Sequence, residues 1–162
     1  MSRFKAIIFD FDGVISESLN VKTEAFAEMY RPYGKAIEEK VKHHHESNGG
    51  ISRFEKFRIY HQEYLGKEID DALVDELADT FSSLVMDKVV AAPYVRKADA
   101  FIKQHYRTYD FFISTGTPEG EINVILERKG LSKYFKEVHG SPAKKPDHVR
   151  GILERYGYDK SE

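Results

Sequence analysis

The sequence has no cysteine among its 162 residues. Disulfide bonds, thiolate metal sites and a cysteine nucleophile are therefore excluded. An excess of basic residues is also missing, because 25 Lys and Arg stand against 27 Asp and Glu, for a net charge of −2. Proteins that bind nucleic acid usually carry a basic excess, so we expect no nucleic-acid partner.

The chain has no long hydrophobic run near its start. The apolar run Ala6–Phe9 ends at Asp10 and is too short for the core of a signal peptide or for a membrane span. We therefore expect a soluble, cytoplasmic protein with no membrane partner. Hydrophobic residues still make up 41% of the chain and aromatic residues 13%, which indicates a folded globule rather than a disordered chain.

The hydrophobic pattern predicts strands and helices in alternation. Residues 4–9 predict a short strand that is buried on both faces. After a hinge-like segment at 91–94, we expect helices and strands in turn, at 95–106, 109–114, 118–129, 134–139 and 147–156. Thr117 is expected to cap the middle helix, with Pro118 in its first turn. This alternation is typical of a parallel α/β sheet.

A helical block interrupts the α/β pattern directly after the first strand. Residues 21–90 predict helices, and one apolar face is expected at Leu73, Leu77, Phe81, Leu84 and Val85. The fold class is therefore α/β, with a parallel sheet and an inserted helical part.

Two aspartates follow the first strand in Phe9-Asp10-Phe11-Asp12-Gly13-Val14. They would lie at the carboxyl edge of the sheet, where open α/β sheets bind their ligands. Paired carboxylates there suit one ionised nucleophile, one proton donor and a Mg²⁺ ion. Plain turn formation, a calcium loop and a phosphoacceptor receiver domain are alternatives. The position of Gly13 does not fit an EF-hand, and a receiver domain has no helical insertion after its first strand.

Two further segments suit a phosphate group. Ser114-Thr115-Gly116-Thr117-Pro118 leads from a strand into a helix, where hydroxyl and main-chain N–H groups bind anions. Gly140-Ser141-Pro142-Ala143-Lys144-Lys145-Pro146 places a lysine at a later strand-to-helix turn. Bases also outnumber acids between Glu127 and Arg150, which favours an anionic ligand, although a solvated helix face explains the same cluster.

In this order and spacing, the three segments resemble the motifs of the haloacid dehalogenase superfamily of phosphohydrolases. The resemblance covers essentially the whole chain: Asp10 to Val14 resembles the first motif, Thr115 the second, and Lys145 before Pro146 the third. It implies a Rossmann-like three-layer core from residues 1–15 and 93–162, and a helical cap domain of the first type from residues 16–92.

The resemblance also implies roles for single residues. Asp10 would attack phosphorus and Asp12 would act as acid and base, while Thr115 and Lys145 hold the phosphoryl oxygens. Mg²⁺ would be held by Asp10 and Asp12. Further phosphate contacts are expected from residues beside the motifs: Gly13, Ser114, Gly116 and Lys144.

The family's fourth motif, an acidic cluster after a further strand, has no counterpart before the sequence ends at Glu162. We therefore expect a truncated sheet of about three strands. The strand before Asp10 would then be an exposed edge, which favours a homodimer through that edge.

Two basic or histidine-rich segments allow more than one interpretation. The run His43-His44-His45 is expected to be structural, since adjacent side chains on a helix point about 100° apart and cannot converge on one ion. Arg53 and Lys56 are candidates for contacting the substrate from the cap, with an ordinary exposed helix face as the alternative.

The sequence thus predicts a Mg²⁺-dependent phosphatase that acts on a small phosphate ester through an aspartyl phosphate. A phosphomutase with the same aspartate pair is one alternative. A catalytically impaired or truncated relative that binds phosphorylated ligands, or self-associates, is the other.

Overall fold

The computed structural model describes residues 4–160. The chain divides into two compact units, an α/β unit of Met1–Glu17 with Ala92–Glu162 and a helical unit of Ser18–Ala91. The predicted fold class, a parallel α/β core with a helical insertion, is confirmed.

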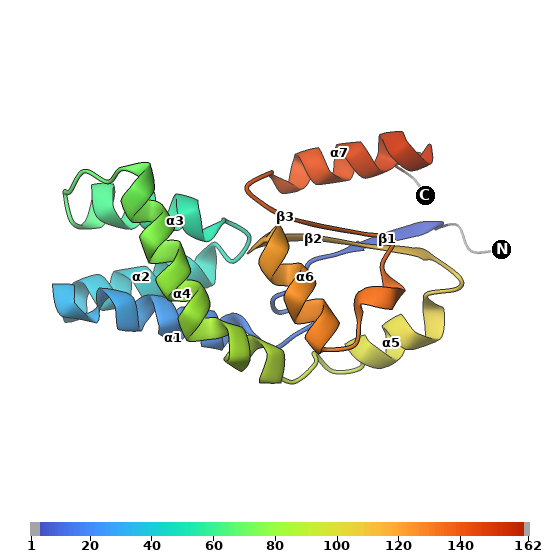
Figure 1. Cartoon of the computed structure of the whole chain (residues 1–162), viewed down its shortest axis with the longest axis horizontal. Helices are drawn as coiled ribbons and strands as arrows, with labels where there is room; N and C mark the ends of the chain where they lie inside the picture. The colour runs from blue at the N-terminus through green and yellow to red at the C-terminus, as the bar shows by residue number, and fades with distance from the viewer. Residues whose placement is uncertain (1–3, 161–162) are drawn as a thin grey trace. The chain divides into compact units, whose positions relative to one another are not determined.

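The α/β unit is built on three parallel strands. They are β1 (Ala6–Phe9), β2 (Asp110–Pro118) and β3 (Glu137–Ser141), in the spatial order β1-β2-β3 (Figure 1). Ile8 is in register with Phe112, and Ile113 with Val138. Because all three strands run the same way, their carboxyl ends meet at one edge, which is where the candidate motifs lie.

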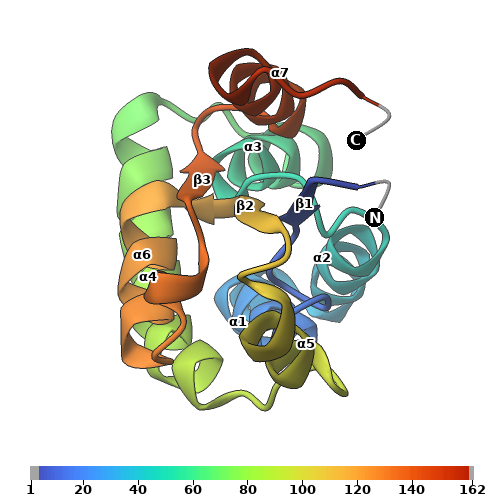
Figure 2. The same cartoon turned by 90° about the vertical axis from the view of Figure 1, so that its right-hand side faces the viewer.

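Helices cover both faces of this sheet. Helix α7 (Lys145–Tyr156) lies on one face, and α5 (Ala98–His105) and α6 (Glu119–Arg128) lie on the other (Figures 1 and 2). Side chains along β2 alternate between the faces. Phe111 packs edge-on against Phe9, with ring centroids 5.0 Å apart, whereas Phe112 packs against Tyr156 of α7, also at 5.0 Å.

One prediction about β2 was wrong. Thr117 was expected to cap a helix, but β2 continues to Pro118, and Pro118 itself is the N-cap residue of α6. The Thr117 hydroxyl therefore remains available for a contact within the α/β unit. The physical reason is that strand pairing extends β2 to the end of β3, where Pro118 is in register with Ser141.

The close approach of β3 to β2 requires glycine at position 140. A β-carbon at Gly140 would stand 2.4 Å from the carbonyl oxygen of Thr117 and 2.5 Å from the main-chain nitrogen of Glu119. Both are main-chain atoms that cannot rotate away.

We expect Gly140→Ala to destabilise the protein by about 1–3 kcal/mol, because the sheet and α6 must shift to admit a methyl group. Gly120→Ala is the matched control, since a β-carbon there meets nothing within 4 Å. Chemical denaturation of both variants measures the effect. Equal stability of the two variants would contradict this packing account.

The helical unit surrounds an aromatic core. It contains four α-helices, α1 (Leu19–Tyr30), α2 (Lys35–Ser47), α3 (Arg53–Ile59) and α4 (Asp71–Ala91), with a short 3₁₀ helix at Arg31–Tyr33 and a π-helical segment at Tyr60–Tyr64. The centroid of the Phe26 ring lies 4.3 Å from that of Phe81 and 5.5 Å from that of Phe57, and both pairs of rings are tilted.

The buried face of α4 differs from the predicted one. Phe81 and Val85 are buried as expected, but Leu73 is exposed. The observed stripe is Val74, Ala78, Phe81, Val85 and Val89. This stripe recurs every three or four residues, so it is a helical face that passes through Val74 and Ala78 instead of Leu73 and Leu77.

Among the described residues, β1 forms the outer edge of the sheet, as predicted. Ala6 and Ile8 line a cavity of about 200 Å³ together with Val149 and Ile152 of α7. The homodimer predicted for this edge is a property of two chains and stays a prediction. None of the described helices is both long enough and apolar enough to cross a membrane.

Candidate active site

Asp10 follows β1 directly, at the carboxyl edge of the sheet. Its Oδ1 accepts a hydrogen bond of 2.7 Å from the main-chain nitrogen of Phe11. Its Oδ2 is 2.5 Å from Nζ of Lys145, which donates a charge-assisted hydrogen bond. The side chain of Asp10 is 30% exposed, so one carboxylate is held in place and still open to a ligand.

Asp12 is fixed by a tight turn after β1. Gly13 has a φ of 74°, and its main-chain nitrogen donates to the Ser16 carbonyl at 2.7 Å. Phe11 is fully buried, and its carbonyl accepts from the main-chain nitrogens of Ile15 and Ser16. The buried side chain of Phe11 anchors the turn in the core. The next residue, Asp12, therefore reaches the carboxyl edge of the sheet.

Two threonines on β2 complete this edge. The Thr117 hydroxyl donates to Oδ2 of Asp12 at 3.3 Å. The main-chain nitrogen of Thr117 donates to Oγ1 of Thr115, also at 3.3 Å, and both residues are buried. Thr117 is a site residue that the sequence analysis missed. The sequence could have indicated it, because Thr115 and Thr117 are two residues apart and such residues share a face on an extended strand.

Lys145 is the first residue of α7, a position where the helix macrodipole disfavours a positive charge. The negative charge of the Asp10 carboxylate compensates for this unfavourable position of Lys145. A residue that breaks a local rule and is held by a distant partner is typical of a functional site. The structure thus brings all four predicted catalytic residues together with Thr117 at one edge: Asp10, Asp12, Thr115 and Lys145.

The predicted phosphate-contacting residues differ in their surroundings. Gly13 and Gly116 are half-buried in the turn and the strand, and Lys144 is exposed at the N-cap of α7. The hydroxyl of Ser114 is buried and hydrogen-bonded to Nδ1 of His148 at 2.8 Å. Contact of these four residues with phosphate stays a prediction.

Arg53 and Lys56 lie in the helical unit and are buried, so the expectation of an exposed helix face is wrong. An Nη of Arg53 donates to the Ser82 hydroxyl, and its guanidinium lies 4.6 Å from the centre of the Phe81 ring. Nζ of Lys56 donates to Nδ1 of His45 at 2.8 Å. Whether either residue contacts a substrate stays a prediction.

The three adjacent histidines on α2 have different surroundings. His43 is exposed, Nδ1 of His44 is 3.2 Å from the Tyr60 hydroxyl, and His45 is buried against Lys56. Burial lowers the pKa of His44 below its usual value. The geometry agrees with the interpretation that adjacent helix positions cannot converge on one ion.

The oxygen donors at Asp10 and Asp12 fit a magnesium ion. Mg²⁺ in proteins takes one or two carboxylates, keeps several waters and shares its remaining positions with a substrate phosphate. Within residues 4–160, no cluster of three or more His, Cys, Asp or Glu could hold a metal ion. Magnesium binding at Asp10 and Asp12 stays a prediction.

Comparison with known proteins identifies the family of this chain. A model of the haloacid dehalogenase-like hydrolases matches residues 4–162. A phosphorylated carbohydrates phosphatase from Thermotoga maritima is 31% identical over 153 residues, which is 88% of this chain and 65% of that protein. The chain thus spans just under two thirds of the length of this relative.

Solved structures show the same fold. A haloacid dehalogenase-like family hydrolase from Streptococcus pneumoniae superposes with a TM-score of 0.64 at 16% identity, covering 97% of this chain and 72% of that one. A β-phosphoglucomutase from Clostridium difficile gives a TM-score of 0.71 at 18% identity, covering 93% and 70%. At these identities the likeness concerns the fold alone.

Proposed function

We propose, because this chain belongs to the haloacid dehalogenase-like hydrolase family, that it is a phosphatase of small phosphate esters. The observation that carries the proposal is the grouping at one sheet edge. Asp10 is paired with Lys145 there, and Asp12 is hydrogen-bonded to Thr117. A carboxylate nucleophile, a second carboxylate and a cation are the groups that stepwise transfer of a phosphoryl group requires.

In the first step, an oxygen of the Asp10 carboxylate attacks phosphorus, and the ester P–O bond breaks. Asp12 gives its proton to the departing alcohol oxygen. In the second step, Asp12 takes a proton from water, which attacks the aspartyl phosphate and releases inorganic phosphate. Asp10 is then ionised and Asp12 protonated, as at the start, so one ester and one water give one alcohol and one phosphate.

Lys145 and Thr115 stabilise the charge on the phosphoryl oxygens. The ammonium group of Lys145 is 2.5 Å from Asp10, so it is placed beside the atom that attacks. The Thr115 hydroxyl is buried on the neighbouring strand. A magnesium ion bound by the Asp10 carboxylate and the Asp12 carbonyl would supply further positive charge there.

A phosphorylated carbohydrate is the substrate class we propose. The support is the name of the Thermotoga maritima relative, a phosphorylated carbohydrates phosphatase, at 31% identity.

The experiment that tests the function is hydrolysis of p-nitrophenyl phosphate, followed by a panel of hexose and pentose phosphates, with Mg²⁺ and with EDTA. We expect hydrolysis that requires Mg²⁺ and releases inorganic phosphate. A folded chain without hydrolysis would contradict the proposal. If beryllofluoride with Mg²⁺ still raised the melting temperature of such a chain, a catalytically impaired protein that binds phosphorylated ligands would be the better account.

A phosphomutase is the second candidate, because a β-phosphoglucomutase shares the fold with a TM-score of 0.71. A mutase moves the phosphoryl group to another hydroxyl, whereas a phosphatase gives it to water. Product analysis by ³¹P NMR separates the two, since only the phosphatase accumulates inorganic phosphate in proportion to substrate consumed.

Three further expectations belong with this proposal. The helical unit serves as a cap, Arg53 and Lys56 contribute to substrate recognition, and the chain forms a homodimer through the β1 edge in the cytoplasm. The apolar side chains of Ala6 and Ile8 at that edge favour the dimer. Sedimentation velocity of the purified chain tests it.

A further inference from the structure

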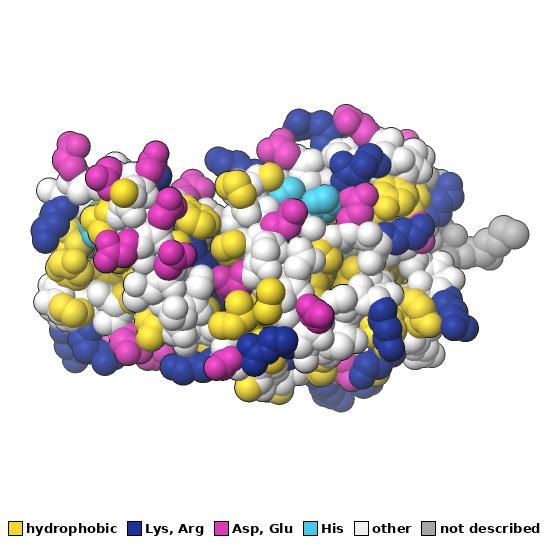
Figure 3. Space-filling model, in the orientation of Figure 1, with side chains coloured by type: hydrophobic (Ala, Val, Ile, Leu, Met, Phe, Trp, Pro, Cys, Tyr) yellow, Lys and Arg dark blue, Asp and Glu magenta, His cyan; other side chains and the backbone are white. Residues whose placement is uncertain are grey.

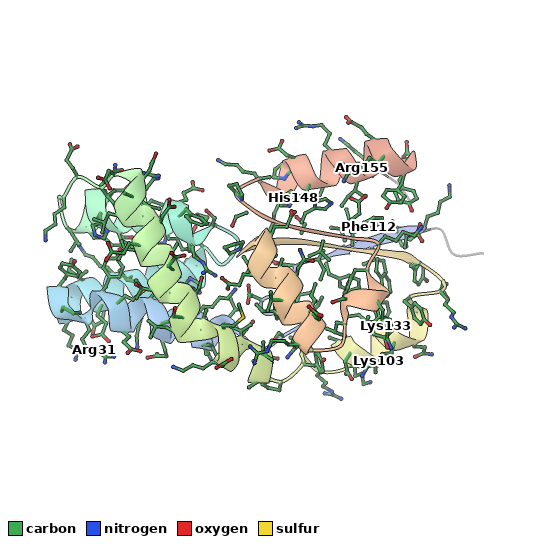
Figure 4. All side chains as sticks on the ribbon, viewed as in Figure 1. Arg31, Lys103, Phe112, Lys133, His148 and Arg155 are labelled. Atoms are coloured by element: carbon green, nitrogen blue, oxygen red, sulfur yellow. The ribbon has the colours of Figure 1, made fainter. Side chains whose placement is uncertain are left out.

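The polar contacts between α7 and the sheet lie at the two ends of the helix. Three side chains of α7 recur four residues apart along the helix: His148, Ile152 and Tyr156. Ile152 is buried, and the Tyr156 ring packs on Phe112 of β2. Figure 4 shows His148 near the start of α7 and Arg155 near its end.

His148 joins the start of α7 to the strand that carries Thr115. Its Nδ1 is 2.8 Å from Oγ of Ser114, and both side chains are buried. Ser114 projects from the same face of β2 as Phe112 and immediately precedes Thr115. Lys145, which pairs with Asp10, lies one helical turn before His148 on α7. A single buried hydrogen bond therefore connects the helix that carries one phosphate-binding residue to the strand that carries another.

The other side of the His148 ring is also fixed. It stacks on His139 of β3, with ring centroids 5.3 Å apart, and Nε2 of His139 is 2.7 Å from Oε2 of Glu137. Arg155 holds Glu137 through two hydrogen bonds and keeps the pKa of Glu137 low, at about 2. Figure 3 shows histidine and acidic side chains side by side on this part of the α/β unit.

The surroundings of His148 favour the neutral form of its ring. Burial lowers its pKa below the usual value, and the neighbouring His139 lowers it further, while a hydrogen bond with the Gly140 main chain and the charges of Glu119 and Asp147 act in the opposite direction. A neutral ring keeps one nitrogen as donor and the other as acceptor. Ser114 is the one side chain found hydrogen-bonded to this ring among the described residues, and the main chain of Gly140 is its other polar neighbour.

An apolar residue would fill this position without the cost of burying a polar ring. A hydrogen bond differs from apolar packing in being directional, and it fixes the position of a helix more sharply. We propose that His148, through Ser114, is a positioning residue that holds the first turn of α7 and thereby places Lys145 beside Asp10. This inference rests on the proposed function, since it assigns His148 to the same site.

Two amide variants provide a matched test. Asparagine places its amide close to where Nδ1 of His148 lies, and it either donates to or accepts from Ser114. Glutamine carries the same amide one methylene further out, near the position of Nε2. We expect His148→Gln to lower kcat/KM for p-nitrophenyl phosphate by about 10- to 100-fold, since small displacements of a catalytic group cost this much. The kcat/KM of His148→Asn should stay within about threefold of that of the wild type.

Two controls separate positioning from stability. Arg155→Met breaks the polar contact at the far end of α7, and we expect a lower melting temperature without a comparable loss of activity. Ser114→Ala combined with His148→Gln should lower the melting temperature no more than His148→Gln alone, because both changes remove one hydrogen bond. Equal activity of the Asn and Gln variants, or losses that follow melting temperature across all variants, would overturn the proposal.

A second measurement does not depend on activity. The ammonium group of a hydrogen-bonded lysine gives a distinct ¹H–¹⁵N NMR signal, assigned here by its absence in Lys145→Arg. We expect this signal to persist in His148→Asn and to be lost in His148→Gln. If the wild type were inactive but the signal behaved in this way, the proposed function would fail and the positioning role would stand. Its persistence in both variants would refute the positioning role even in an active enzyme.

Discussion

Replacing Asp10 by asparagine is expected to reduce the hydrolysis of p-nitrophenyl phosphate by about four orders of magnitude or more, as loss of a covalent nucleophile does in other hydrolases. Asparagine has the same shape and still accepts the hydrogen bond from the Phe11 nitrogen. What it lacks is the negative charge and the nucleophilic oxygen. Because the Asp10–Lys145 pair is partly exposed, its loss should change the stability by no more than about 1 kcal/mol.

The same sheet offers a matched control for this variant. Asp110 begins β2 at the opposite end of the sheet, and its Oδ2 is 2.6 Å from Nζ of Lys136. The side chains of Asp10 and Asp110 are 30% and 32% exposed. Asp110→Asn should therefore leave the activity unchanged while removing a similar ion pair. Steady-state kinetics of both variants, with circular dichroism to check the fold, make the comparison. A similar loss in both would mean that the effect of Asp10→Asn is structural.

Replacing Asp12 by asparagine is expected to lower turnover by about 10²- to 10⁴-fold, the usual contribution of a general acid or base. Asparagine still accepts the hydrogen bond that Thr117 donates to Asp12, so the geometry is kept. The loss should be smaller for the first step with p-nitrophenyl phosphate, because p-nitrophenolate leaves without a proton. It should be larger for an alkyl phosphate, whose leaving oxygen needs one.

Rapid-mixing kinetics measure this difference. If Asp12 activates the water of the second step, Asp12→Asn should release a burst of p-nitrophenolate and then react slowly, because the aspartyl phosphate accumulates. Asp99→Asn is the control, as Asp99 is paired with Lys103 on the surface of α5. Equal losses for aryl and alkyl esters, without a burst, would argue against an acid–base role for Asp12.

The aspartate pair could be predicted from the sequence because it is local. An apolar strand that ends in Asp10, with Asp12 in the turn, places both residues by short-range rules alone. The pairing of Asp10 with Lys145 spans 135 positions, and no propensity or spacing gives that contact. The resemblance to a family assigned both residues to one site, through the order of three motifs, and the match of residues 4–162 to the family confirms that resemblance.

The errors have local physical causes. Thr117 before Pro118 has the pattern of a helix cap, yet pairing of β2 with β3 extends the strand to Pro118 and frees the hydroxyl for Asp12. Arg53 and Lys56 have the pattern of an exposed face, yet both are buried. Long side chains of this kind are buried where a ring or a polar group receives their charged end, and only tertiary packing brings Phe81 and His45 to that position.

The position of His148 also could not be predicted from the sequence. Nothing in its neighbours along the sequence separates it from an ordinary polar residue on a helix surface. Its burial and its hydrogen bond with Ser114 depend on α7 packing across β2.

The central claim is that Asp10 becomes phosphorylated during turnover, and chemical trapping tests it most directly. The chain is mixed with Mg²⁺ and p-nitrophenyl phosphate, quenched, treated with borohydride and digested for mass spectrometry. An aspartyl phosphate is reduced by borohydride to homoserine, whereas a free carboxylate is not. We predict homoserine at position 10 in the wild type, at a higher level in Asp12→Asn, and none without substrate. Turnover of substrate with no modification at Asp10, or modification at another carboxylate, would contradict the account.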